Sequence, residues 1–178
     1  MTSRHSELDF KGQQPLVVRT AVHDLPELTA LARRIWHSHY PGIISTAQID
    51  YMLERMYSLD RLERELREER VTYFHIGPPG SMSAFAAVGP TDDSRIHKLH
   101  KLYVQADHQK KGYGRALLRA VVSTAQGAGA RQLTLCVNKR NQIALKAYRA
   151  YGFQTRAEAC VDIGGGYFMD DFILRLDL

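Results

Sequence analysis

The chain has 178 residues, of which 44% are hydrophobic and 24% are charged, and this suits one globular domain with a single core. Such a composition excludes disordered and fibrous proteins, and no run approaches the roughly 20 apolar residues of a membrane span. A net charge of +5 suits an anionic partner, because the basic clusters lie in the second half of the chain. The N-terminus lacks the apolar core of a signal peptide, so we expect a cytoplasmic location.

The first part of the chain predicts a short strand followed by helices. A β-like run at 15–21 precedes a helical pattern over 23–40. Ser45 and Gln48 form a capping signature for the next helix. Apolar residues recur at helical spacing from there to Leu66, so we expect one long helix.

Strand patterns dominate after residue 70. Three runs, at 71–77, 83–89 and 95–104, have connections too short for helices and therefore predict an antiparallel meander. A helical stripe and the strand 131–137 follow, and this strand should pair in parallel with 95–104, because strand, helix, strand forms a crossover unit. The last predicted elements are a short helix within 141–153 and two strands around 153–162 and 167–176.

The two cysteines do not indicate a metal site or a disulfide framework. Cys136 and Cys160 are too few for such a framework and lack metal-ligand spacing. We expect a reduced pair of core thiols and no metal.

The sequence QKKGYGRALL at 109–118 places glycines at the start of a helix, directly after a strand. A helix N-terminus offers unpaired N–H groups and the positive end of the helix dipole, which together bind phosphate. Gly112 and Gly114 let the backbone approach a ligand, although a helix start that merely uses glycines explains them equally well. A dinucleotide fingerprint is excluded because Leu117 stands where a small residue is needed, and a P-loop lacks its Gly-Lys-Ser/Thr.

A family resemblance rests on two motifs. QKKGYG matches the pattern Gln/Arg-x-x-Gly-x-Gly/Ala, and VNKRNQIALKAYRAYGF resembles Asn-x-x-Ala-x-x-x-Tyr-x-x-x-Gly-Phe, about 30 residues downstream with a strand between them. In this order the motifs resemble the Gcn5-related N-acetyltransferases (GNAT). The resemblance implies a single α/β (α+β) domain over 1–178, with 1–14 as a flexible N-terminal segment. Its expected fold is a mixed, mostly antiparallel sheet of about seven strands, with a V-shaped splay between the central strands and about four flanking helices.

The resemblance also implies an activity, a co-substrate and a set of binding residues. The expected enzyme moves the acetyl group of acetyl-CoA directly to a primary amine in a ternary complex, without a metal, and family members often pair as homodimers. The acceptor is a small amine, a polyamine or a protein amine. The residues that would bind acetyl-CoA are Tyr103, Val104, Gln109, Lys110, Lys111, Gly112, Tyr113, Gly114, Arg115, Asn141, Ala144 and Tyr148.

Amide formation from a thioester needs a neutral amine, a stabilised oxyanion and a protonated leaving thiolate. By resemblance the backbone amide of Leu102 meets the oxyanion and the phenol of Tyr148 is the general acid. An alternative role for Tyr148 is ring packing in the core. An alkylammonium has a pKa near 10.4, so a base would help to prepare the nucleophile.

The candidate base is a histidine, because no carboxylate lies between Arg95 and Val104. Period-2 alternation predicts that His97 and His100 lie on opposite faces and that His100 shares a face with Leu102. An imidazole near pKa 6.5 suits proton removal at neutral pH, so His100 is the better candidate, with water as the alternative.

Three further assignments are weaker. Cys136 is not expected to accept acetyl first, because the family transfers directly and its neighbours are apolar. Trp36, His39 and Tyr40 fall where family members shape the acceptor pocket, although core packing explains Trp36 equally well. Other classes remain open: a non-catalytic acyl-CoA-binding sensor would lack the proton-transfer group, and a nucleic-acid-binding module would need an interleaved aromatic and basic surface, which the sequence does not show.

Overall fold

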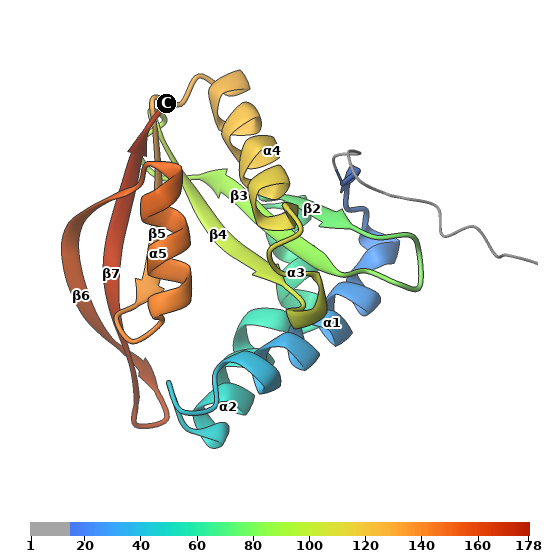
Figure 1. The fold of residues 1–178 in the computed structure, drawn as a ribbon, viewed down its shortest axis with the longest axis vertical. Helices are drawn as coiled ribbons and strands as arrows, with labels where there is room; N and C mark the ends of the chain where they lie inside the picture. The colour runs from blue at the N-terminus through green and yellow to red at the C-terminus, as the bar shows by residue number, and fades with distance from the viewer. Residues whose placement is uncertain (1–14) are drawn as a thin grey trace, which may run out of the picture.

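The computed structural model describes residues 15–178, and the expected flexible segment 1–14 lies outside this range. The described chain forms a seven-stranded sheet flanked by helices (Figure 1). No helix between residues 15 and 178 is long and apolar enough to cross a membrane. The strands are β1 (Val17–Arg19), β2 (Thr72–Ile76), β3 (Ala84–Pro90), β4 (Ile96–Val104), β5 (Gln132–Asn138), β6 (Gln154–Gly164) and β7 (Tyr167–Asp177). The α-helices are α1 (Leu25–His39), α2 (Thr46–Tyr57), α3 (Leu59–Arg67), α4 (Tyr113–Gly127) and α5 (Gln142–Tyr151).

The sheet has the predicted mixed topology. Its order is β1-β2-β3-β4-β5-β7-β6, and every neighbouring pair is antiparallel except β4 and β5. The meander β2-β3-β4 is therefore confirmed. The parallel pair β4 and β5, joined through α4, is confirmed as well, because a parallel connection needs a crossover.

The two central strands separate after a short paired stretch. β4 and β5 pair only from Ile96 opposite Gln132 to Lys98 opposite Thr134. Beyond that point β4 continues to Val104 and β5 continues to Asn138, and the two strands diverge (Figure 1). The predicted V-shaped splay is confirmed. Beyond the paired stretch, the edges of β4 and β5 that face each other carry backbone N–H and C=O groups that no neighbouring strand pairs.

Helices cover the two faces of the sheet with separate cores. On one face, here called the α4 side, α4 and α5 pack through residues such as Leu117, Val121 and Leu145. On the other face, the α1 side, α1 to α3 pack through residues such as Trp36 and Leu62. A ligand lying in the V can therefore be reached from both faces.

The long helix expected up to residue 66 is two helices, α2 and α3. Ser58 has φ −61° and ψ 148°, which is an extended conformation, so it ends one helix and begins the next. Tyr57, just before the break, is buried, whereas Leu59, just after it, is 43% exposed. The spacing had predicted that Leu59 would lie on one continuous buried apolar stripe. The Ser45 cap is confirmed, because its hydroxyl accepts a hydrogen bond from the Gln48 amide at 3.2 Å.

A β-bulge interrupts the alternation of β4. Ala87 on β3 pairs with Lys101, but the next residue, Val88, pairs with Leu99, so His100 has no partner opposite it. Such a bulge reverses the facing of the residues that follow. Leu99 consequently faces the α4 side, whereas Lys101 faces the α1 side.

Candidate active site

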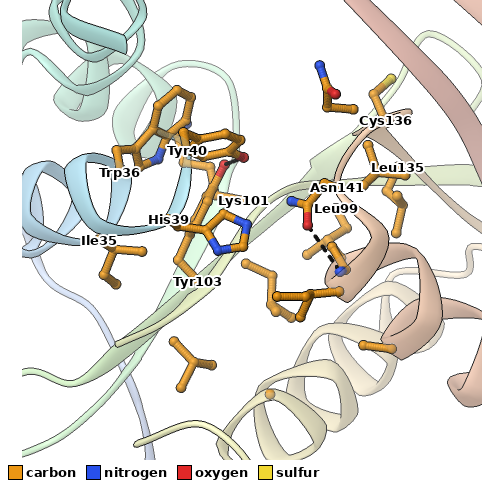
Figure 2. A pocket seen from close by; sticks show the side chains of 18 of the residues that line it. Ile35, Trp36, His39, Tyr40, Leu99, Lys101, Tyr103, Leu135, Cys136 and Asn141 are labelled. Atoms are coloured by element: carbon orange, nitrogen blue, oxygen red, sulfur yellow. Dashed lines mark hydrogen bonds between the residues drawn. The ribbon is translucent and has the colours of Figure 1, made fainter. Parts of the chain in front are cut away.

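A cavity of about 640 Å³ occupies the V between β4 and β5. Its wall includes the glycine loop before α4, the splayed ends of both strands, and residues of α1 and α2. Figure 2 shows Trp36, His39 and Tyr40 on one side of this space, with Asn141 and Cys136 across from them. The volume lies in the range of about 300–1,000 Å³ that small-molecule sites occupy.

The glycine loop forms the end of the cavity that suits phosphate. Gly112 has φ +83°, in the left-handed region, and α4 begins at the next residue, Tyr113. The leading amides of α4 therefore have no acceptors within the helix and face the end where the dipole is positive. Lys110 also adopts a left-handed φ of +60°, which is uncommon for a residue with a side chain. Of the residues predicted to bind the pyrophosphate end of acetyl-CoA, the cavity is lined by Gln109, Lys110, Gly112, Tyr113, Gly114 and Arg115 but not by Lys111, and their contact with the ligand stays a prediction.

The splayed end of β4 supplies the middle of the cavity wall. Leu102 and Val104 pack toward the α4 side, and Tyr103 packs toward the α1 side. The Val104 carbonyl accepts a hydrogen bond from the Gln109 side chain at 3.3 Å. This bond ties the glycine loop to the strand that precedes it.

Asn141 has a structural role that the sequence did not reveal. Its side-chain oxygen accepts a hydrogen bond from the Ala144 amide at 3.2 Å, so Asn141 caps α5 (Figure 2). The side chain is 6% exposed and lines the cavity. Asn141 therefore fixes the start of α5, and with it the position of Tyr148 about two turns further on.

Tyr148 lies in the cavity wall on α5. Its ring packs against Phe153 at a centroid distance of 5.5 Å. Burial, and secondarily the neighbouring Tyr40, raises the pKa of Tyr148 above its ordinary value. The phenol is therefore protonated throughout the physiological range, as a proton donor must be.

Aromatic side chains from α1 form the opposite wall. The Tyr40 and Trp36 rings lie 4.5 Å apart, and the hydroxyl groups of Tyr40 and Tyr103 lie 3.2 Å apart. Burial raises the pKa of Tyr40, although its hydrogen bond to Tyr103 opposes this. Trp36 is 2% exposed and packs in the core while also lining the cavity, so its core packing is confirmed and its contact with an acceptor stays a prediction. The half-buried ring of His39 packs edge-on against Tyr40.

Hydrogen bonds between distant segments hold together the part of the molecule where α1 and α2 meet β7 and the loop before α5. The guanidinium of Arg140 donates to the carbonyl oxygens of Gly42 and Ile43 at 2.6 and 2.8 Å, which ties the α1–α2 loop to the loop before α5. The Gln48 side chain donates to the Phe168 carbonyl at 2.8 Å and so joins α2 to the β6–β7 hairpin. These bonds hold the loops and the hairpin around this part of the cavity in place.

His100 does not lie where regular alternation predicted. Because of the bulge it faces the α1 side, where a Cβ on Gly89 would meet its Nε2 at 3.2 Å, whereas Leu102 packs on the α4 side. The expectation that both share a face is wrong for this reason. Burial, followed by the charges of Lys101 and Lys98, lowers the pKa of His100 to about 4. His100 as the base stays a prediction that this placement disfavours.

The cysteines are not the core thiols expected from the sequence. Cys136 and Cys160 are both exposed. Leu135 and Val137 face the core on the α4 side, so Cys136 faces the cavity from the α1 side. Although Cys136 is exposed to the cavity, partial desolvation by the surrounding walls raises the pKa of its thiol, with Lys98 opposing, and the thiol form is a poor nucleophile.

Two carboxylates in the described cavity wall were missed by sequence reasoning, Glu65 and Asp171. Glu65 was hidden within a charge-rich segment that indicates a solvated helix face. Asp171 had a detectable signal: Asp170 and Asp171 are adjacent within the otherwise apolar run YFMDDFIL at 167–174, and alternation directs one of two such neighbours inward. The inward residue is Asp171, which is 5% exposed.

This chain is similar to known proteins both in sequence and in fold. The model of the acetyltransferase (GNAT) family matches residues 29–153. An uncharacterized N-acetyltransferase of Mycobacterium tuberculosis is 26% identical over 152 residues, which cover 85% of this chain and 97% of that protein. A spermidine N(1)-acetyltransferase of Thermoplasma acidophilum is 22% identical over 138 residues, covering 76% of this chain and 86% of that protein.

Solved structures agree with this likeness. A PaiA N-acetyltransferase from Thermoplasma acidophilum in complex with coenzyme A has a TM-score of 0.78 and 20% identity, and the match covers 93% of this chain and 100% of that one. A GCN5-related N-acetyltransferase structure from Rhodopseudomonas palustris has a TM-score of 0.77 at 16% identity, covering 93% of this chain and 97% of that one. With the family model matching most of the chain, this protein belongs to the GNAT family of acetyltransferases.

Proposed function

We propose that this protein transfers the acetyl group of acetyl-CoA directly to a primary amine within a ternary complex. The proposal rests on one observation: the same continuous cavity is lined by the glycine loop at one end, by β4 and β5 in the V, and by the aromatic residues of α1. A donor and an acceptor that enter from the two faces can meet inside it. Family membership and the coenzyme A complex of a structural neighbour support the identity of the donor.

The residues divide the chemistry between them. The pyrophosphate would lie on the leading amides of α4, beside Lys110 and Arg115. The Leu102 amide would stabilise the oxyanion that forms when the amine attacks the thioester carbonyl. As the C–S bond breaks, the departing thiolate would take the phenolic proton of Tyr148.

A thiol-release assay tests this proposal. Wild-type protein is mixed with acetyl-CoA and a panel of small amines, polyamines, peptide N-termini and lysine peptides, and free coenzyme A is followed with a thiol reagent. We expect release that depends on one class of amine. Acetyl-CoA binding by calorimetry without turnover on any amine would favour a non-catalytic acyl-CoA-binding sensor instead.

The acceptor class is narrowed by the character of the wall. Trp36, Tyr40, Met52 and Phe168 surround a space that also receives a carboxylate. Aromatic faces and a carboxylate together attract an alkylammonium ion. The likeness to a spermidine N(1)-acetyltransferase makes polyamines a natural part of the panel.

A further inference from the structure

Asp171 is a buried carboxylate with no partner in the described chain. It lies on β7, opposite Asn138 of β5, and is 5% exposed. No hydrogen bond or ion pair joins its carboxylate to another residue between 15 and 178. A buried charge is normally paired, because its desolvation is costly. An unpaired one in a cavity wall therefore suggests a cationic ligand.

The neighbouring aspartate behaves in the ordinary way. Asp170 points to the other face of β7, is exposed, and forms an ion pair with Lys139 at 2.6 Å. Lys139 also pairs with Glu158 at 2.8 Å. Asp170 thus provides a matched control, one residue away but outside the cavity wall.

Glu65, the other carboxylate in the described cavity wall, is already neutralised. It receives hydrogen bonds from Lys101 at 2.5 Å, from Arg61 at 2.9 Å and from Tyr73. These partners occupy its oxygens, so it has little capacity left for a ligand. Asp171 is the carboxylate in this wall that remains free to bind one.

Asp171 also lies level with the expected position of the thioester. Leu102 follows the last paired residue of β4 by four positions, and Asn138 follows its partner on β5 by four. At about 3.3 Å per residue both lie roughly 13 Å beyond the fork, although the bulge shortens β4 slightly. Asp171 is the direct cross-strand neighbour of Asn138 and faces the α1 side, from which the acceptor would approach.

Charged and titratable groups from several neighbouring elements influence the Asp171 carboxyl. Burial, followed by the charge of Asp170, raises the pKa of Asp171 to about 6, while Lys98 and Lys139 oppose the rise. Tyr40 from α1 and Cys136 from β5 also lie near enough to interact with it. The carboxylate is therefore mostly ionised at neutral pH and yet basic enough to take a proton.

We propose that Asp171 binds the ammonium group of the acceptor and accepts its first proton. This role rests on the proposed acetyl transfer to an amine. One N–H bond of the ammonium ion breaks, its electron pair stays on nitrogen, and the proton moves to Asp171. The freed pair then attacks the thioester carbonyl, the C–S bond breaks, and the thiolate takes a proton from Tyr148. Tyr148 is reprotonated by the second proton lost from the nitrogen, and Asp171 releases the first to water.

The kinetic test compares Asp171→Asn with Asp170→Asn. Asparagine keeps the shape of the side chain and removes its charge and basicity. We expect Asp171→Asn to lower kcat/KM for the amine by about 10²- to 10⁴-fold and to remove the acidic limb near pH 6. Asp170→Asn should retain the rate at neutral pH and an acidic limb, but the limb should move to lower pH, because the charge of Asp170 that raises the pKa of Asp171 is lost. Acetyl-CoA affinity, measured by calorimetry, should match wild type in both variants, and an acidic limb that persists in Asp171→Asn would overturn the proposal.

A binding test measures the contribution of Asp171 to ammonium affinity independently of turnover. Trp36 is the single tryptophan of the chain and lines the cavity, so its fluorescence reports on ligands there. Titration with butylammonium should show saturable binding that Asp171→Asn weakens at least tenfold, whereas butanol should bind both proteins equally. Equal butylammonium affinity in the two proteins would refute the role of Asp171. If wild-type protein binds butylammonium through Asp171 but releases no thiol with any amine, the proposed function fails and the ammonium site stands.

Discussion

The ammonium nitrogen of Lys101 lies 2.5 Å from a carboxylate oxygen of Glu65, in the core between β4 and α3. Both side chains are almost fully buried, and the Tyr73 hydroxyl bonds to each of them. Lys101 can face α3 only because the bulge at His100 reverses the facing of the strand. The ion pair thus joins α3 to the strand that carries Leu102.

Lys101→Met should destabilise the fold. The change leaves Glu65 buried with less compensation, and breaking one side of a buried pair costs about 3–5 kcal/mol. We expect a loss near the lower end of this range, because Arg61 remains bonded to Glu65. Urea unfolding measures it. The control Arg67→Met breaks an exposed pair with Glu63 and should cost less than about 1 kcal/mol.

The cost of Lys101→Met should depend on pH. Burial acts to raise the pKa of Glu65, but Lys101, Tyr73 and Arg61 together lower it below its ordinary value. A carboxyl with a lowered folded pKa stabilises the fold above its unfolded pKa, about 4.3, and this contribution is lost as pH falls. The difference between wild type and variant should therefore shrink below about pH 4. A difference that stays constant from pH 7 to pH 3 would contradict the ionised pair.

Tyr148→Phe should lower turnover far more than acetyl-CoA affinity. The ring and its packing on Phe153 remain, and only the proton donor is lost. General acid catalysis contributes about 10²- to 10⁴-fold, so kcat should fall within that range. Steady-state kinetics and calorimetry measure the two quantities. Turnover equal to wild type would remove Tyr148 as the acid.

His100→Ala should leave the acidic limb of the rate profile where it is. A pKa of about 4 means that the imidazole is already neutral at the pH values where this limb lies. Rate profiles of wild type and variant between pH 5 and pH 8 should run parallel. Loss of the limb in this variant would restore His100 as the base and would argue against Asp171.

Gly112→Ala should reduce both stability and coenzyme A affinity. Its φ of +83° strains any side chain, at a cost of about 1–2 kcal/mol, and relief of the strain would shift the start of α4. The control Gly127→Ala lies in the last turn of the same helix, with nothing within 4 Å of the added Cβ. It should stabilise the protein by up to about 1 kcal/mol, because alanine is the better helix former. Thermal unfolding and calorimetry compare the pair, and equal effects would exclude strain at Gly112.

The sequence predicted the fold where local patterns repeat over several residues. Alternation of apolar and polar residues predicted the strands, and the short connections between three of them predicted the antiparallel meander. The motif at 109–118 predicted the start of α4. The same reasoning failed at single residues. Ser58 separates α2 from α3, although the apolar residues on both sides of it keep helical spacing in the sequence. The bulge at His100 arises from pairing with β3, which is a non-local interaction.

The sequence by itself determined the elements of the proposed donor site, because the glycine loop, its strand and the Asn-to-Tyr spacing of α5 lie close together in the chain. Only the tertiary structure determined which residues form the proposed acceptor side. Asp171 is about 130 residues from Tyr40, and the two meet because β7 inserts beside β5 while α1 packs across the V. Local sequence patterns indicate which face of a strand or helix a side chain lies on. The proposed role of Asp171 rests on a carboxylate that is buried without a hydrogen-bond or ion-pair partner, and this depends on every element that folds around it.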